Sequence, residues 1–398
     1  MNYLNQKYST VIVGGGIIGC AIAYELSRHG HKNIAVIEKN STIPGLNQSS
    51  TNGGVIHSGI YYPKDIEPLK AKLCVLGNKL MYEFCKKYEL PHKRTGKLIL
   101  ARNSQEEENL DFFFQIGIEN GVEIKKISAK LAARMEPNIG TVTSALLVPS
   151  TGSAALSPLI EKLKELAKTD GVKFFLGTRV NAIHAEKTKF IITLHTNSGI
   201  KSMKSDSVIN AAGLYSDEIA KMINPSNNYQ IDPVRGELYK YNPTSRKDIS
   251  FKGMHLYSIP FCYYSGTKQI AELPVAEIRK LLRAGKVTKT LGVHVSPFGN
   301  FVTVGPLKTF NVGKEDYMTN LKNPEDYIQK VHHLMPGLRG EDLKPHYAGI
   351  MAVLKGSTDF IIKRDDVFPN CIQLVGMDSP AWTSCLAVAK YVKELIHK

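Results

Sequence analysis

The sequence predicts an α/β protein with a Rossmann-like dinucleotide-binding domain and a second, α+β domain that contains an antiparallel sheet. Three observations predict this fold: a strand–turn–helix–strand unit over residues 10–38, a return of alternating helix and strand patterns over residues 157–223, and several short β-type runs between residues 235 and 305. A chain of 398 residues is long enough for two such domains.

The first element is the N-terminal βαβ unit. Residues 10–16, TVIVGGG, form an apolar run that ends in glycines, residues 17–30 place apolar side chains at helical spacing, and residues 33–39, NIAVIEK, form a second buried strand. Gly14, Gly16 and Gly19 stand in G-x-G-x-x-G order, and Glu38 follows nineteen residues after Gly19. This context predicts a dinucleotide site, with the pyrophosphate at the helix N-terminus and a ribose at Glu38.

The later elements alternate between the two domains. Residues 66–135 are mainly helical around a short strand, GKLILA, and the final residues indicate two strands, a glycine turn and a helix. We therefore predict a discontinuous cofactor-binding domain of residues 1–80, 145–225 and 340–398. Residues 81–144 and 226–339 would form the substrate-binding cap.

Composition and charge limit the class of protein. No apolar run approaches the roughly 18 residues that span a bilayer, and the N-terminus shows no secretory signal, so we expect a cytoplasmic location. The 51 Lys and Arg against 36 Asp and Glu give a net charge of +15, but the excess is mostly dispersed lysine and no recognition motif accompanies it, which disfavours a nucleic-acid partner. None of the six cysteines forms a C-x-x-C pair, and no metal site is predicted.

Several motifs along almost the whole chain resemble those of one family. In order they are the glycine turn with Glu38, STNGGVIHSGIYYP, INAAGLYSD, PVRGELY, GVHVSPFGNFVTVGP and GMDSPAWTSCLAVA. This order resembles the D-amino-acid-oxidase-like FAD-dependent oxidoreductases, most of all their L-2-hydroxyglutarate dehydrogenase/oxidase branch, and FAD-dependent glycerol-3-phosphate oxidases are similar nearly as far. The resemblance implies a FAD-binding Rossmann-like domain of the GR2 type.

The resemblance also implies which residues bind FAD. They belong to the glycine turn, the second strand end, the loop that begins at Ser49, and three later turns. They are Gly14, Gly16, Ile17, Gly19, Glu38, Lys39, Ser49, Ser50, Asn52, Gly53, Gly54, Val180, Ala212, Gly213, Gly376, Ser379 and Thr383. A helix N-terminus at the last of these turns would stabilise negative charge on a reduced flavin.

His57 is the candidate catalytic base. Its ordinary pKa near 6.5 leaves a neutral imidazole available at neutral pH, and the related oxidases use the histidine of GVIH as the base. It lies three residues after Gly54, on the loop expected to touch the flavin. The alternative is a histidine that only hydrogen-bonds the cofactor or the backbone.

The substrate-binding candidates are groups that can hold an anion. Arg235 is the candidate carboxylate anchor because a guanidinium pairs with a carboxylate through two hydrogen bonds. Tyr61, Tyr62, His294 and Lys355 are further candidates, with Ser296 beside His294. Each has a structural alternative: an ion pair for Arg235, packing for the tyrosines, an ordinary strand position for His294, and solvation for Lys355.

Two departures from the family pattern bear on the substrate. Met351 stands where the family stretch normally has an arginine that helps to bind the substrate anion, and SPAWT, with Ala381 and Trp382, replaces SPGLT.

We therefore expect FAD-dependent oxidation of a small anionic 2-hydroxy acid to the 2-oxo acid by hydride transfer to flavin N5, with L-2-hydroxyglutarate the first candidate. Glycerol 3-phosphate is the runner-up. An RNA-acting flavoprotein and a divergent flavoprotein of unknown substrate are weaker alternatives. The electron acceptor would be oxygen or a quinone, and a basic surface would allow peripheral association with the inner face of a membrane.

Overall fold

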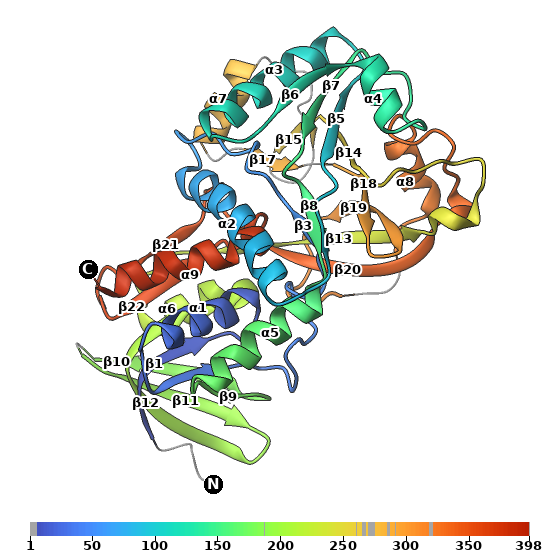
Figure 1. The fold of residues 1–398 in the computed structure, drawn as a ribbon. Helices are drawn as coiled ribbons and strands as arrows, with labels where there is room; N and C mark the ends of the chain where they lie inside the picture. Colours follow the sequence, from blue (N-terminus) through green and yellow to red (C-terminus); the bar gives the residue numbers. More distant parts are fainter. Residues whose placement is uncertain are drawn as a thin grey trace.

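The computed structural model describes residues 6–397, apart from residues 187, 260, 265–267, 270–274, 285–286, 291 and 318–320. Two eight-stranded sheets organise the chain, and two three-stranded sheets accompany them. Figure 1 shows one body around the N-terminal strand and one at the opposite end of the molecule, with helices α2 (Pro68–Lys87) and α9 (Ala381–His397) between them.

The first large sheet runs in the order β10–β11–β12–β1–β2–β9, with β22 beside β12 and β21 beside β22. Its strands are β1 (Lys7–Val13), β2 (Ile34–Ile37), β9 (Lys173–Phe175), β10 (Arg179–Ala185), β11 (Phe190–Thr196), β12 (Gly199–Asn210), β21 (Ile361–Arg364) and β22 (Cys371–Val375). Parallel pairing joins β9, β2, β1, β12 and β22. Segments from the start, middle and end of the chain thus form one Rossmann-like sheet, as the sequence predicts (Figure 1).

The glycine turn joins β1 to helix α1 (Ile17–Arg28). Gly14 has a φ of +110°, a conformation that favours glycine. A Cβ on Gly19 would lie 1.9 Å from the carbonyl oxygen of Gly14, so only glycine lets the helix approach the strand this closely. Both glycines are therefore required by the fold itself, before any ligand is considered.

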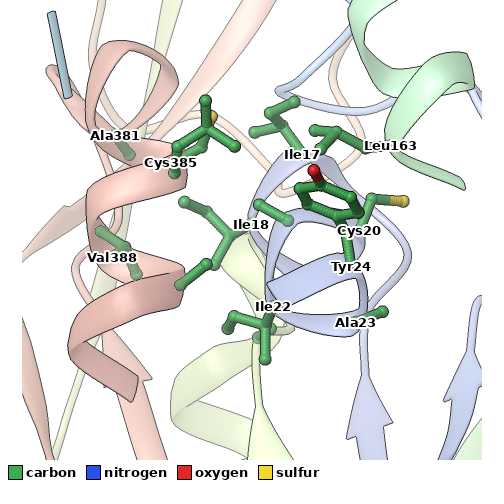
Figure 2. Close-up of a cluster of buried hydrophobic side chains, with 14 of the residues drawn as sticks. Ile17, Ile18, Cys20, Ile22, Ala23, Tyr24, Leu163, Ala381, Cys385 and Val388 are labelled. Carbon is green, nitrogen blue, oxygen red and sulfur yellow. The ribbon is translucent and has the colours of Figure 1, made fainter. Parts of the chain in front are cut away.

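Helix α1 is packed between two other helices, α5 (Leu156–Thr169) and the C-terminal α9 (Ala381–His397). Figure 2 shows Ile18 and Ile22 of α1 directed toward Cys385 and Val388 of α9, while Leu163 of α5 lies on the other side. Residues 17–27 of α1 are all buried, which explains the nearly continuous apolar sequence of this helix.

The second large sheet has the order β20–β13–β19–β18–β14–β5–β7–β6. Its strands are β5 (Lys97–Ala101), β6 (Lys125–Ser128), β7 (Ser144–Val148), β13 (Ile231–Tyr241), β14 (His255–Ser258), β18 (His294–Phe298), β19 (Phe301–Thr309) and β20 (Lys344–Leu354). Every neighbouring pair is antiparallel except β14 and β5, which are parallel. This is the mainly antiparallel sheet that the sequence predicts for the second domain.

A small sheet, β3–β8–β4, and helix α2 connect the two bodies. The strands are β3 (Val55–Ile56), β4 (His92–Lys93) and β8 (Gly152–Ala154), and α2 (Pro68–Lys87) packs along α9. The remaining elements are helices α3 (Ser104–Glu119), α4 (Ala129–Met135), α6 (Ser216–Ile223), α7 (Val275–Arg283) and α8 (Pro324–Val331), the strands β15 (Phe261–Tyr264), β16 (Lys268–Gln269) and β17 (Val287–Thr290), and three short 3₁₀ helices at Gly213–Tyr215, Pro243–Ser245 and Gly340–Asp342.

The sheets suggest where the domain boundaries lie. Two strands of the second sheet, β7 and β20, fall on the other side of the predicted boundaries: β7 pairs with β5, and β20 pairs with β13. The predicted ranges 145–225 and 340–398 put nearly all of β7 and all of β20 in the cofactor domain. We propose a division that follows the sheets and assigns both strands to the second domain.

Candidate active site

A cavity of about 420 Å³ lies where the two large sheets meet. Its walls come from the glycine turn and the end of β2 on one side and from β13, β18, β19 and β20 on the other. The turn before α9 and the loop that contains Ser49 complete it. One end of the cavity therefore presents the predicted nucleotide-binding residues, and the other end presents His57 and His294.

The nucleotide end is built from the start of α1 and from Glu38. The N–H of Ile17 donates to the hydroxyl of Ser49 at 2.9 Å, which holds the Ser49 loop against the helix N-terminus. The Glu38 carboxylate accepts from the N–H of Gly15 at 2.7 Å and from the N–H of Asn40 at 2.8 Å. The buried Glu38 carboxylate fits the ribose of FAD. The N-terminus of α1 follows a glycine-rich turn and has no acidic residue in its first turn, which fits the pyrophosphate.

Most of the predicted cofactor residues line this cavity. They are Gly14, Gly16, Ile17, Glu38, Lys39, Ser49, Asn52, Gly53, Val180, Ala212, Gly213, Gly376 and Ser379. The structure thus brings together residues from six separate parts of the sequence.

Gly19, Ser50, Gly54 and Thr383 are absent from the described cavity wall and support it from behind. Gly19 allows α1 to pack on β1. Ser50 donates a hydrogen bond to the carbonyl of Gly45, within its own loop. Gly54 has a φ of +62°, and a Cβ there would lie 2.3 Å from the Phe298 ring.

His57 follows β3 and lines the cavity, and its backbone is held on both sides. Its N–H donates to Thr383 Oγ1 at 2.9 Å, and its carbonyl accepts from Asn78 Nδ2 at 2.9 Å. Thr383 Oγ1 also donates to the carbonyl of Val55 at 3.2 Å, so one hydroxyl ties β3 to the start of α9. Thr383, predicted as a cofactor residue, therefore positions His57.

The surroundings of His57 keep its imidazole neutral. Burial, followed by the positive charge of Lys97, lowers the pKa of His57 well below its usual value. Burial and Lys97 also lower the pKa of His294 to about 3. Both histidines are thus proton acceptors at neutral pH.

Lys97 is a buried base that the sequence reasoning missed. It opens β5, is 0% exposed, and donates from Nζ to the Tyr61 hydroxyl at 3.1 Å. Its Nζ also lies 4.6 Å from the centroid of the Tyr61 ring and 4.3 Å from that of Tyr257. Burial lowers the pKa of Lys97 to about 7.

Some of the other substrate-binding candidates line the cavity and others do not. Tyr61, Tyr62 and His294 line the cavity. The ring of His294 stacks on Tyr257 with centroids 4.2 Å apart, and its Nδ1 lies 3.0 Å from the Ser296 hydroxyl. These contacts fix the orientation of the imidazole.

Arg235 is not among the residues that line the described wall of the cavity, and its role as the carboxylate anchor stays a prediction. Its guanidinium lies 2.9 Å from the carboxylate of Glu237 and 2.9 Å from that of Asp316. Glu237 is fully buried, and this cation offsets the cost of burying its charge. Lys355 is exposed and is not among the residues on the described cavity wall, and its role stays a prediction.

Lys70 and Lys308 line the cavity and were not among the sequence-derived candidates. Lys70 lies in the first turn of α2, where its own N–H and that of Leu69 donate to the Asp359 carboxylate at 2.8 and 2.9 Å. Its Nζ lies 2.7 Å from Asp378, in the turn before α9. A lysine inside an otherwise apolar strand, GPLKTF, was the available signal for Lys308.

The two departures from the family pattern are both at the cavity. Met351, Ala381 and Trp382 line it, so the position of the expected arginine is occupied by an uncharged side chain in this chain. The indole Nε1 of Trp382 is buried without a hydrogen-bond partner among the described residues. These residues change the shape and charge of the cavity wall.

The fold thus combines a dinucleotide-binding sheet with a cavity that lies against a mainly antiparallel sheet. The family model described as FAD dependent oxidoreductase, DAO, matches residues 9–395, and the chain belongs to this family. FAD is therefore its cofactor.

Three relatives are similar to almost the whole chain. The mitochondrial L-2-hydroxyglutarate dehydrogenase of Caenorhabditis elegans is 34% identical over 431 residues, which cover 97% of this chain and 92% of that protein. The corresponding Arabidopsis thaliana enzyme is 28% identical over 97% of this chain and 83% of its own length. A glycerol 3-phosphate dehydrogenase of Caloramator mitchellensis is 29% identical over 98% of this chain and 74% of its own length.

Among solved structures, the FAD-bound L-α-glycerophosphate oxidase of Mycoplasma pneumoniae superimposes with a TM-score of 0.82 and 24% identity. The match covers 98% of this chain and 95% of the other. Glycine oxidase of Geobacillus kaustophilus matches with a TM-score of 0.77 and 17% identity, over 98% and 95% of the two chains. These likenesses show that the fold is shared.

Proposed function

We propose that the protein oxidises a small anionic 2-hydroxy acid to the 2-oxo acid, and that L-2-hydroxyglutarate is the first candidate substrate. One observation carries this proposal: the neutral imidazole of His57 lines the same cavity as the cations of Lys70 and Lys308. An alcohol that bears an anionic group suits this combination of a base and positive charge. The similarity to L-2-hydroxyglutarate dehydrogenases supports this choice of acid.

The residues of this chain would act by binding, orientation and proton transfer. Bound FAD supplies the hydride acceptor. His57 would take the hydroxyl proton on Nε2, because Nδ1 is buried without a partner among the described residues. Thr383 and Asn78 fix the backbone of His57, so the imidazole is held ready for the transfer.

An anaerobic screen of flavin reduction tests the proposal. The purified holoenzyme is mixed with L- and D-2-hydroxyglutarate, lactate, malate and glycerol 3-phosphate, and the flavin absorbance is followed. L-2-hydroxyglutarate is expected to bleach the flavin fastest. Failure of every 2-hydroxy acid to reduce the flavin would contradict the proposal.

Glycerol 3-phosphate is a second candidate because Lys70 and Lys308 also suit a phosphate, and because a glycerol 3-phosphate dehydrogenase is among the relatives. The same screen separates the two candidates. A flavin that only glycerol 3-phosphate reduces would assign the phosphate substrate.

The electron acceptor is proposed to be oxygen or a quinone. None of the described helices is long and apolar enough to cross a bilayer. Peripheral association through the basic surface stays a prediction, and co-sedimentation with anionic vesicles tests it. Failure to sediment with the vesicles at low salt would contradict it.

A further inference from the structure

Four basic side chains line the described wall of the cavity: Lys39, Lys70, Arg179 and Lys308. Lys39 Nζ lies 2.7 Å from the Glu315 carboxylate, and Lys70 Nζ lies 2.7 Å from that of Asp378. Arg179 is exposed at the nucleotide end of the cavity, with its guanidinium 5.8 Å from the Tyr215 ring centroid. The first three cations therefore have partners or lie away from His57.

Lys308 differs from the other three. It lies near the end of β19, opposite Gly236 of β13, which has no side chain to cover it. Within the described part of the chain, no carboxylate lies within ion-pair distance of its Nζ, and no hydrogen bond is made by that nitrogen. The charged neighbours of Lys308 are Asp378 and Lys70. The charge of Lys308 also lowers the pKa of His294, after burial and Lys97.

The acids near Lys308 do not neutralise it. Asp378 is already bound to Lys70, and burial raises the pKa of its carboxyl above the usual value. Glu67, another acid on the cavity wall, is buried, and after burial and Cys74 it contributes to the raised pKa of the Tyr62 hydroxyl. Burial lowers the pKa of Lys308 only to about 8, so the amine is mostly charged at pH 7. A charged amine that is half-buried on a cavity wall is stabilised when an anion joins it.

We propose that the Lys308 ammonium determines substrate specificity by binding the anionic group of the substrate, on the wall between His294 and the Lys70–Asp378 pair. The inference rests on the proposed function for the identity of the substrate. The inference itself specifies only that the ligand carries a carboxylate or a phosphate and that Lys308 is its counter-ion. Arg235, Lys355 and Met351 take no part in this contact.

Titration of the oxidised holoenzyme with unreactive anions tests the proposal. Glutarate and inorganic phosphate are added separately, and the shift of the flavin absorbance gives a Kd for each. Lys308→Met is expected to weaken binding of the preferred anion about 30-fold, as for the loss of one member of a buried charge pair. Lys308→Arg is expected to restore most of the affinity. Lys240→Met, which removes an exposed lysine from β13 of the same sheet, is the matched control and is expected to leave each Kd unchanged.

The two anions identify the class of ligand: tighter glutarate binding indicates a carboxylate substrate, and tighter phosphate binding indicates a phosphate ester. If Lys308→Met does not fold, Lys308→Gln replaces it with the same expected loss. A folded, FAD-containing variant that binds the anions as tightly as the wild type would overturn the proposal, as would a wild-type flavin that responds to neither anion. Lys308-dependent anion binding in an enzyme that no 2-hydroxy acid reduces would refute the proposed function alone.

Discussion

At the scale of single residues, the active-site end of the molecule is organised around positive charge. Lys97 has no carboxylate partner in the described part of the chain, and its amine contacts the aromatic faces of Tyr61 and Tyr257 and the Tyr61 hydroxyl. Burial lowers the pKa of His57 and of His294, and the charge of Lys97 lowers both further. Burial of the Lys97 amine itself carries a cost to the stability of the fold.

That cost depends on pH in a defined direction. The pKa of Lys97 is lowered from 10.5 to about 7 in the folded protein, so between these values the unfolded chain binds more protons than the folded one. The free energy of unfolding that depends on Lys97 therefore rises as the pH increases from about 7 toward 10.5. Lys97→Met should be more stable than the wild type at pH 6, and the difference should shrink above pH 7. Thermal melts from pH 6 to 9 measure it, and a difference that does not vary with pH would contradict the assignment.

Replacing His57 tests the role of the base. His57→Ala is expected to lower the turnover number about 100-fold or more, because general base catalysis is lost. FAD content should stay normal, since the backbone contacts to Thr383 and Asn78 remain. His184→Ala, at an exposed position on β10, serves as the control and should behave like the wild type. Near-normal turnover in His57→Ala would remove His57 from the mechanism.

At the scale of elements, one short segment connects both bodies over the nucleotide end of the cavity. Three consecutive residues, Lys314, Glu315 and Asp316, form ion pairs with three different elements. Lys314 lies 2.7 Å from Asp217 at the start of α6, Glu315 lies 2.7 Å from Lys39 after β2, and Asp316 lies 2.9 Å from Arg235 of β13. The next described residue, Tyr317, lines the cavity. We propose that Arg235 anchors the segment through its ion pair with Asp316.

We predict that this segment slows FAD release. Glu315→Gln should raise the Kd for FAD about threefold, since an exposed ion pair contributes under about 1 kcal/mol. The triple variant Lys314→Met/Glu315→Gln/Asp316→Asn should show a larger increase. Flavin fluorescence after dilution measures release.

The matched control for this prediction is Lys162→Met, which removes an exposed Lys162–Glu165 pair on α5. High salt should bring the wild-type release rate closer to that of the variants, because salt screens exposed ion pairs. Release rates that are the same in the triple variant and the wild type would refute the role of the segment.

At the scale of the whole molecule, the cavity walls come from both large sheets, so bound FAD would be held by residues of both bodies. Ligand that binds only the folded state at a concentration 100 times its Kd adds about 2.7 kcal/mol to stability. We predict that FAD raises the melting temperature of the apoprotein and that both bodies melt in one transition. Riboflavin, which lacks the adenosine diphosphate, is the control and should stabilise less. Equal melting temperatures with and without FAD would contradict this prediction.

The fold could be predicted from the sequence where its signals are local. Gly14, Gly16, Gly19 and Glu38 predict the first βαβ unit because their spacing is itself a local pattern that follows a strand and opens a helix. The strand order of the second sheet could not be predicted, since β14 pairs with the distant β5, and such pairing leaves no local pattern.

The same limit explains why the sequence reasoning missed Lys70 and Lys97. Both resemble solvated lysines until distant segments bury them. Arg235 did carry a local signal: Arg235 and Glu237 are two residues apart on one strand and so share a face. That pattern favours an internal ion pair over a substrate anchor.

The single hydroxyl between β3 and α9 has a consequence for evolution and engineering. Thr383 Oγ1 makes both hydrogen bonds: it accepts from the N–H of His57 and donates to the carbonyl of Val55. A valine at position 383 would keep the shape but leave two backbone groups without partners, whereas serine would keep both hydrogen bonds. Selection should therefore couple position 383 to the His57 loop. Libraries that reshape the Ala381–Trp382 turn to accept new substrates should retain a hydroxyl there.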